Sequence, residues 1–295
     1  MRKTPKTQPE PSVFRDFVAL TKPSITMMCV LMAAGGIGLA PGTISGWELI
    51  STLAGIALIV GSANALNMAW EHETDKLMQR TKKRPLPAGR MSVKAAWTFG
   101  AMIGMAGLWM LCVGANPQAS LIGGLAIFAY VFVYTPMKRV SPLALLIGSF
   151  PGAAPPLIGW VAVTGTIDAA GLVLFGIVML WQIPHFAAIT LFRKHDYAQA
   201  GIRTTAVVMG DMAAKLEALI YSSLLVPVSL MLVPLGVAGR FYFVVSLALG
   251  LMFWAINIKG FMPGAGDRWA RSFFKASLVY LPLLTLGLLL DVFLQ

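Results

Sequence analysis

Residues 49–84 read LISTLAGIALIVGSANALNMAWEHETDKLMQRTKKR, an uncharged apolar run followed directly by a densely charged segment. The apolar part belongs to a stretch over 47–69 that has about the 20 residues an α-helix needs to cross a bilayer. The charged part is too costly to place in hydrocarbon. The pattern therefore predicts a membrane-spanning helix that ends at a polar loop on the membrane surface.

The composition of the whole chain extends this prediction. Of its 295 residues, 57% are hydrophobic and only 12% are charged, whereas a soluble domain carries about 25% charged residues. The net charge of +11 is compatible with a nucleic-acid-binding protein. However, the bases lie in short loops between apolar blocks, where membrane topology and anionic lipid or substrate explain them better. We therefore predict an all-α integral membrane protein that contacts membrane lipid and has no nucleic-acid partner.

Nine apolar segments, separated by turns that contain Pro and Gly, predict a bundle of nine transmembrane helices. The chain is expected to form a single domain over residues 1–295, in which residues 1–23 are a polar N-terminal tail. The predicted helices cover residues 24–41, 47–69, 93–114, 118–136, 142–162, 168–191, 215–236, 241–262 and 272–293.

The distribution of Lys and Arg predicts the orientation of this bundle. All of the 23 basic residues except Arg240 fall in the tail or in loops on one side of the nine-helix arrangement. Cytoplasmic loops are enriched in Lys and Arg, so the N-terminus is predicted to be cytoplasmic and the C-terminus external.

A first polar cluster begins inside the second apolar segment. Asn67, Glu71 and Asp75 are spaced by four residues, so they would share one face of a helix. Their oxygen atoms are of the kind that binds Mg²⁺, which also favours phosphate oxygens. The cluster predicts a diphosphate site, although acids that merely offset loop charges remain an alternative. Basic residues that could bind phosphate follow directly: Arg80, Lys82, Lys83 and Arg84.

A second polar cluster surrounds the end of the sixth segment. His185 lies in an apolar helix, where a polar side chain suggests a function, although a packing role remains open. Trp181 adds a large flat surface beside it. Asp196 could complete a cation site with the first cluster, and Lys194 and Arg203 could bind the diphosphate. Between the two clusters, the side chains of Tyr134, Lys138 and Arg139 are expected to line the same cytoplasmic cavity.

Together these segments resemble the protohaem IX farnesyltransferases (haem O synthases), a family within the intramembrane aromatic prenyltransferase superfamily. The resemblance covers about residues 16–215, with its motifs in matching order. The segments that carry it are LTKPS at 20–24, the stripe of Asn67, Glu71 and Asp75, YTPMKR at 134–139, GAAPPLIGW at 152–160 and WQIPHF at 181–186.

The resemblance implies a nine-helix bundle around a central cavity that opens to the cytoplasm, in a bacterial inner membrane. It also implies a reaction. The farnesyl group of farnesyl diphosphate would be transferred to a vinyl side chain of haem B with addition of water, giving haem O and diphosphate. Mg²⁺ would be the cofactor, and a haem A synthase is the candidate protein partner.

The resemblance also assigns roles to residues. The stripe matches the family's first Asn/Asp motif, and Asp196 matches its second acidic segment, in which this chain has only one acid. Glu71 stands where Asp is commoner. The implied haem contacts are His185, Trp181 and Tyr134. Two alternatives remain open: transfer to another aromatic acceptor such as a quinone precursor, or an anion transporter, which would have charged or broken helices near the bilayer midplane.

Overall fold

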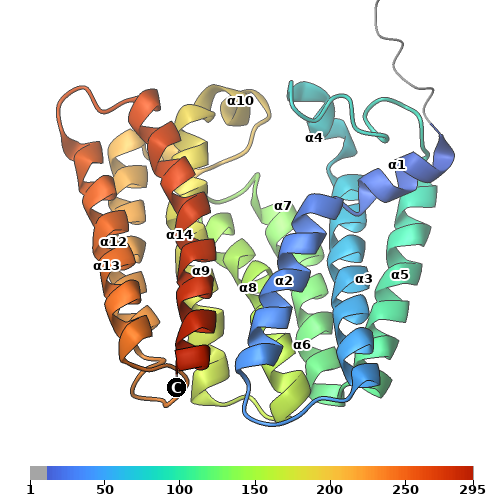
Figure 1. Cartoon of the computed structure of the whole chain (residues 1–295). Helices are drawn as coiled ribbons and strands as arrows, with labels where there is room; N and C mark the ends of the chain where they lie inside the picture. Colours follow the sequence, from blue (N-terminus) through green and yellow to red (C-terminus); the bar gives the residue numbers. More distant parts are fainter. Residues whose placement is uncertain (1–11, 295) are drawn as a thin grey trace, which may run out of the picture.

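The computed structural model describes residues 12–294, and every regular element in that range is helical (Figure 1). Residues 1–11 of the predicted tail lie outside the described range. The helices are α1 (Val13–Leu20), α2 (Pro23–Leu39), α3 (Gly46–Trp70), α4 (His72–Leu77), α5 (Val93–Gly114), α6 (Pro117–Phe128), the π-helical η1 (Ala129–Tyr134), α7 (Thr135–Met137), α8 (Ala144–Thr164), α9 (Ala169–Phe192), α10 (Lys194–Gln199), α11 (Thr205–Val208), α12 (Asp211–Leu230), α13 (Arg240–Ile258), the 3₁₀-helical η2 (Lys259–Phe261) and α14 (Asp267–Leu294).

Within the described residues, eight helical segments are long and apolar enough to cross a membrane. The shorter α2 makes nine if it is taken together with α1, from which it is bent by 46°. One span consists of α6, η1 and α7 in succession, over Pro117–Met137. The all-α membrane architecture predicted from the sequence is confirmed, and the count of nine agrees with it when the bent pair is counted as one span.

Most of the predicted helix ends agree with the structure to within a few residues, but the seventh helix does not. Its prediction was 215–236, whereas α12 covers Asp211–Leu230. A run of turns follows Leu230, and it contains Pro234, which has no backbone N–H for helical hydrogen bonding. The apolar composition of residues 231–236 concealed this earlier end.

The predicted polar tail contains a helix that was not predicted from the sequence. The short helix α1 is amphipathic: Phe14 is exposed, while Asp16 and Leu20 are buried against the rest of the protein. Arg90 donates hydrogen bonds from Nε and Nη2 to the carboxylate of Asp16, at 2.9 to 3.2 Å. This contact, which raises the pKa of the Arg90 guanidinium, ties α1 to the loop that follows α4.

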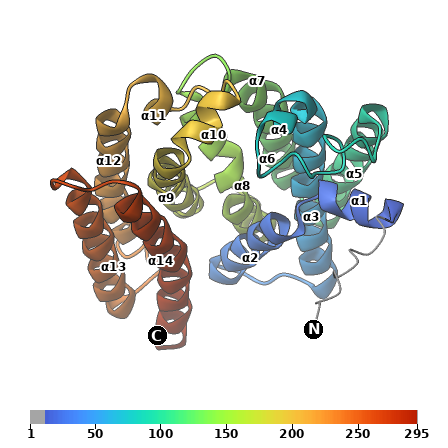
Figure 2. The ribbon, with the colours of Figure 1, turned by 90° about the horizontal axis from the view of Figure 1, so that it is seen from above.

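The short polar helices gather at one end of the bundle. Figure 1 shows α4 and α10 at the same end, with α14 finishing at the opposite end, and Figure 2 looks down on that polar end. The long spans pack closely where small residues meet. On the face between α3 and α5, a Cβ added to Gly107 would lie 2.9 Å from the carbonyl oxygen of Gly55. Such contacts hold α3, and with it the first polar cluster, in a fixed position.

Candidate active site

A cavity of about 420 Å³ lies within the bundle at the end that carries α4 and α10. Its lining comes from both sides of the molecule: α2, α3, α4, η1, α8, α9 and α12 all contribute. The predicted central cavity is therefore present. Ten of the residues that the sequence singled out line it: Asn67, Glu71, Asp75, Arg80, Arg84, Tyr134, Lys138, Trp181, His185 and Arg203.

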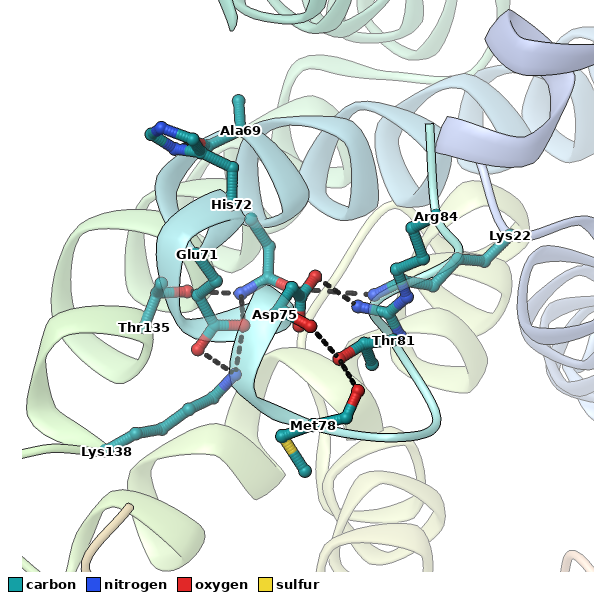
Figure 3. A network of polar contacts seen from close by, with 11 residues as sticks. Lys22, Ala69, Glu71, His72, Asp75, Met78, Thr81, Arg84, Thr135 and Lys138 are labelled. Carbon is teal, nitrogen blue, oxygen red and sulfur yellow. Dashed lines mark hydrogen bonds and ion pairs between the residues drawn. The ribbon is translucent and has the colours of Figure 1, made fainter. Parts of the chain in front are cut away.

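The acidic stripe lies along the cavity wall as its spacing predicted. The helical path is interrupted at Glu71, which ends α3 and precedes α4. The backbone nevertheless keeps its four-residue hydrogen bonds, from Glu71 N–H to Asn67 O at 2.9 Å and from Asp75 N–H to Glu71 O at 2.8 Å. The three side chains consequently stay on one face, and Figure 3 shows Glu71 and Asp75 close to Lys138 and Arg84.

The amide of Asn67 organises the deepest part of this cluster. Its Nδ2 donates to Glu71 Oε2 and to Thr135 Oγ1, both at 2.9 Å, and it is only 2% exposed. Its Oδ1 accepts from Lys22 Nζ at 3.5 Å. Thr135 was not expected from the sequence. It follows η1, a π-helical turn of the kind that often marks functional sites, and its hydroxyl donates to the carbonyl of Tyr130.

Both carboxylates of the stripe are paired with bases (Figure 3). Lys138 Nζ lies 3.0 Å from each carboxylate oxygen of Glu71, and Arg84 Nη1 lies 2.7 Å from Asp75 Oδ2. The Asp75 side chain is 6% exposed, so it depends on that partner. Lys138 also lies over the ring of Tyr134, 4.4 Å from its centroid. Bases and acids thus alternate across one wall of the cavity.

Lys22 is a cavity residue whose place the sequence did not reveal. It connects α1 to α2 and has φ +48°, the only positive φ among the non-glycine residues described. Left-handed backbone is unfavourable for a residue with a side chain, and such conformations cluster at functional sites. The following Pro23 disfavours right-handed helix at this position. The strained junction directs the Lys22 ammonium toward Asn67.

Five predicted site residues do not line the cavity: Lys82, Lys83, Arg139, Lys194 and Asp196. Asp196 pairs at 3.3 Å with Arg193, which directly precedes α10, and Lys194 pairs with Asp211 at 2.7 Å. Among residues 12–294, no three His, Cys, Asp or Glu side chains are close enough to bind a metal together. The structure therefore does not bring Asp196 to the stripe, because its contacts are made locally.

Neighbouring Glu73 is exposed to solvent. Its carboxylate accepts a hydrogen bond from Lys76 Nζ at 2.6 Å, and this contact lowers the pKa of Glu73. The residue is therefore part of the exposed surface of α4 and not of the cavity wall.

The opposite wall is aromatic and is held by α14, a helix for which the sequence indicated no role in the site. Trp181 and His185 stack with ring centroids 4.9 Å apart, and Phe274 lies 5.0 Å from the His185 ring. Ser277 accepts from His185 Nδ1 at 2.7 Å, since its own hydroxyl donates to the carbonyl of Phe274. Its carbonyl also accepts from Trp181 Nε1. In this arrangement Nε2 of His185 carries no proton, so it can accept a hydrogen bond or ligate a metal ion.

Comparison with known proteins places this architecture in a family. The model of the UbiA prenyltransferase family matches residues 27–279. The chain belongs to the UbiA prenyltransferase family. Two curated relatives, both named protoheme IX farnesyltransferase, match almost end to end. The one from Myxococcus xanthus is 42% identical, covering 95% of this chain and 96% of its own. The one from Anaeromyxobacter dehalogenans is 43% identical, with 97% of each chain covered.

Solved structures share the UbiA fold at low sequence identity. A structure of digeranylgeranylglyceryl phosphate synthase has a TM-score of 0.81 and 15% identity, covering 94% of this chain and 98% of its own. A UbiA homologue from Archaeoglobus fulgidus, bound to GPP and Mg²⁺, has a TM-score of 0.70 and 17% identity, with 92% and 99% covered. These likenesses confirm the arrangement of the helices.

Proposed function

We propose that this membrane protein transfers the farnesyl group of farnesyl diphosphate to a vinyl side chain of haem B, with addition of water, to give haem O and diphosphate. The observation that carries the proposal is the identity of 42 to 43% to protoheme IX farnesyltransferases over almost the whole chain. The cavity supports it, because one wall is rich in bases and acids and the other is aromatic.

The diphosphate would bind at the basic wall. Five bases line the cavity: Lys22, Arg80, Arg84, Lys138 and Arg203. Cationic side chains fixed around the leaving group stabilise the negative charge that builds on it as the C–O bond breaks. The loop of the second cluster is held beside Lys138, the partner of Glu71, since the backbone N–H of Arg203 donates to the carbonyl of Lys138 at 2.8 Å.

The acidic stripe fits a divalent cation that is shared with the substrate. Asn67, Glu71 and Asp75 offer an amide oxygen and two carboxylates, and phosphate and water would supply the remaining ligands. The hydroxyl of Thr74, buried in the cavity lining beside Asp75, has no hydrogen-bond partner, so a phosphate oxygen or a metal-bound water would satisfy it. When bound, Mg²⁺ would supply positive charge to the leaving group. The Archaeoglobus homologue bound to GPP and Mg²⁺ is consistent with this proposal.

Haem B would lie against the aromatic wall. Trp181 and His185 present a flat surface, and Nε2 of His185 suits a contact with the macrocycle or its iron. Tyr134, on the opposite side of the cavity, would help to enclose the reacting groups. Aromatic faces attract an allylic cation, and an enclosed cavity keeps bulk water away from it.

We further propose that the chain is one domain over residues 1–295 in a bacterial inner membrane, with a cytoplasmic N-terminus and an external C-terminus. The basic loops at the α4 and α10 end, and the bacterial sources of the curated relatives, support this orientation and location. A haem A synthase, proposed on the family resemblance, would receive the product.

Haem analysis of membranes tests the proposal. The chain is expressed in a bacterium that makes haem B but lacks a haem O-forming enzyme, and extracted haems are identified by mass spectrometry. We expect haem O in the native membranes and none with Glu71→Gln or Asp75→Asn expressed at equal level. A prenylated quinone precursor beside unchanged haem B would instead favour the alternative acceptor, and no prenylated product would contradict the proposal.

A further inference from the structure

One acidic side chain of the cavity has no place in the diphosphate site. Glu217 lies about two turns into α12 and lines the cavity. Its Oε2 is inaccessible to solvent and has no hydrogen-bond partner. In Figure 2, α12 stands on the far side of α8 and α9 from α3 and α4, which carry the acidic stripe. Glu217 and the acidic stripe are therefore carried by helices on different sides of α8 and α9.

Its pairing distinguishes Glu217 from the other two acids of the cavity. Glu71 is paired with Lys138, and Asp75 with Arg84. Of the carboxylates in the cavity lining of residues 12–294, Glu217 alone takes part in no ion pair. An acidic side chain in a membrane-spanning helix is costly without a partner and usually serves a function. A carboxylate left in this state attracts a proton or a cation that arises in the cavity.

The proposed reaction produces such a proton. As the C–O bond of farnesyl diphosphate breaks, C1 of the farnesyl group bonds to the terminal vinyl carbon of haem B. The inner vinyl carbon is left as a cation. A water oxygen bonds to that carbon, and one of its two protons must leave to give the hydroxyl of haem O. Resting on the proposed function, we propose that Glu217 is the catalytic residue that accepts this proton, while the O–H electron pair stays on oxygen.

The other candidates for this role are already engaged. Glu71 and Asp75 are held by bases beside the proposed diphosphate site. Nδ1 of His185 is bonded to Ser277, and its Nε2 is the proposed haem contact. Near Glu217, the hydroxyl of Thr205 also lines the cavity and interacts with the carboxylate, so it could hold a water molecule in place.

The product distribution of Glu217→Gln tests the assignment. Without a base, the cation can lose a carbon-bound proton and give a farnesylated haem that is lighter than haem O by one water. We expect haem O formation per folded protein to fall about 100-fold, the usual scale for a lost general base. The share of the dehydrated product should rise. Mass spectrometry measures that share within the converted haem, so it does not depend on protein yield.

Two variants make the test specific. Asp211→Asn, on the same helix but exposed and paired with Lys194, should keep the native rate and product ratio. Glu217→Asp keeps a carboxylate and should recover part of the rate. If Glu217→Gln does not fold, Glu217→Asp decides: an intermediate rate with more dehydrated product supports the assignment, and a native ratio overturns it.

Three results overturn the assignment while the proposed function stands. These are a native rate and ratio in folded Glu217→Gln, a complete loss of both farnesylated products in that folded variant, or a shift of the ratio by His185→Gln that Glu217→Gln does not cause. If the native chain forms no farnesylated haem at all, the proposed function itself has failed. That outcome is seen before any variant is compared.

Discussion

Replacing Arg84 by Gln should separate what the Asp75–Arg84 pair does for folding from what it does for catalysis. The substitution leaves a carboxylate that is 6% exposed without its cation, which was 2.7 Å away. Breaking a buried ion pair from one side costs about 3–5 kcal/mol. Since 24% of the Arg84 side chain is exposed, we expect a smaller loss, about 2–3 kcal/mol, near the value of a hydrogen bond to a charged group.

The assay is a double-mutant cycle in detergent micelles. Unfolding of the native chain, Arg84→Gln, Asp75→Asn and the double variant is followed by tryptophan fluorescence, with haem O formation measured in parallel. The double variant should regain most of the stability lost in Arg84→Gln, because no unpaired charge remains. Haem O formation should be lost in all three variants. Equal stability of the double variant and Arg84→Gln would refute the pairing argument, and native activity in Arg84→Gln would refute the diphosphate role.

Three further perturbations give separate tests. Lys138→Gln should lower kcat/KM for farnesyl diphosphate about 10²–10³-fold, as for a lost transition-state donor. The matched variant Lys94→Gln, at an exposed position at the start of α5, should leave kcat/KM unchanged. Equal effects of the two substitutions would contradict the role of Lys138. Asp16→Asn should lower unfolding stability by about 1–2 kcal/mol, because it weakens the contact between α1 and Arg90; an unchanged midpoint would show that α1 is held by packing alone. EDTA should abolish transfer and excess Mg²⁺ should restore it, whereas full activity in EDTA would exclude the metal role of the stripe.

The transmembrane helices could be predicted from the sequence because a segment that crosses the hydrocarbon of a bilayer must be apolar. Apolar blocks of about 20 residues have few alternatives to a helix in a bilayer. The positions of Asn67, Glu71 and Asp75 followed from helical periodicity, which survives the interruption at Glu71. Neither inference needed knowledge of which helices are neighbours.

Contacts between segments that are far apart in the sequence could not be predicted in the same way. Ser277 is 92 residues from His185, and no local pattern marks it as a partner. Lys22 reaches the cavity through a left-handed junction that depends on how α1 packs. Asp196 was expected to complete a cation site with the acidic stripe. Its carboxylate instead pairs with Arg193, three residues earlier in the chain.

Glu217 is a different case, because the sequence itself contains a feature that marks it as a candidate functional residue. It is an acidic residue inside the predicted span 215–236, where a charged side chain indicates a function. It was not among the predicted site residues. The structure shows instead that its side chain lines the cavity and that Oε2 has no hydrogen-bond partner.

Acceptor competition in a defined membrane shows whether haem B is the acceptor that the protein farnesylates. The purified chain is placed in lipid nanodiscs with farnesyl diphosphate, Mg²⁺, and equal amounts of haem B and an aromatic quinone precursor, and both acceptors are analysed by mass spectrometry. We expect that haem B gains a farnesyl group and one water, that the quinone precursor stays unmodified, and that Asp75→Asn abolishes the product. Farnesylation of the quinone precursor with unmodified haem B, or undiminished haem O from Asp75→Asn, would contradict this expectation.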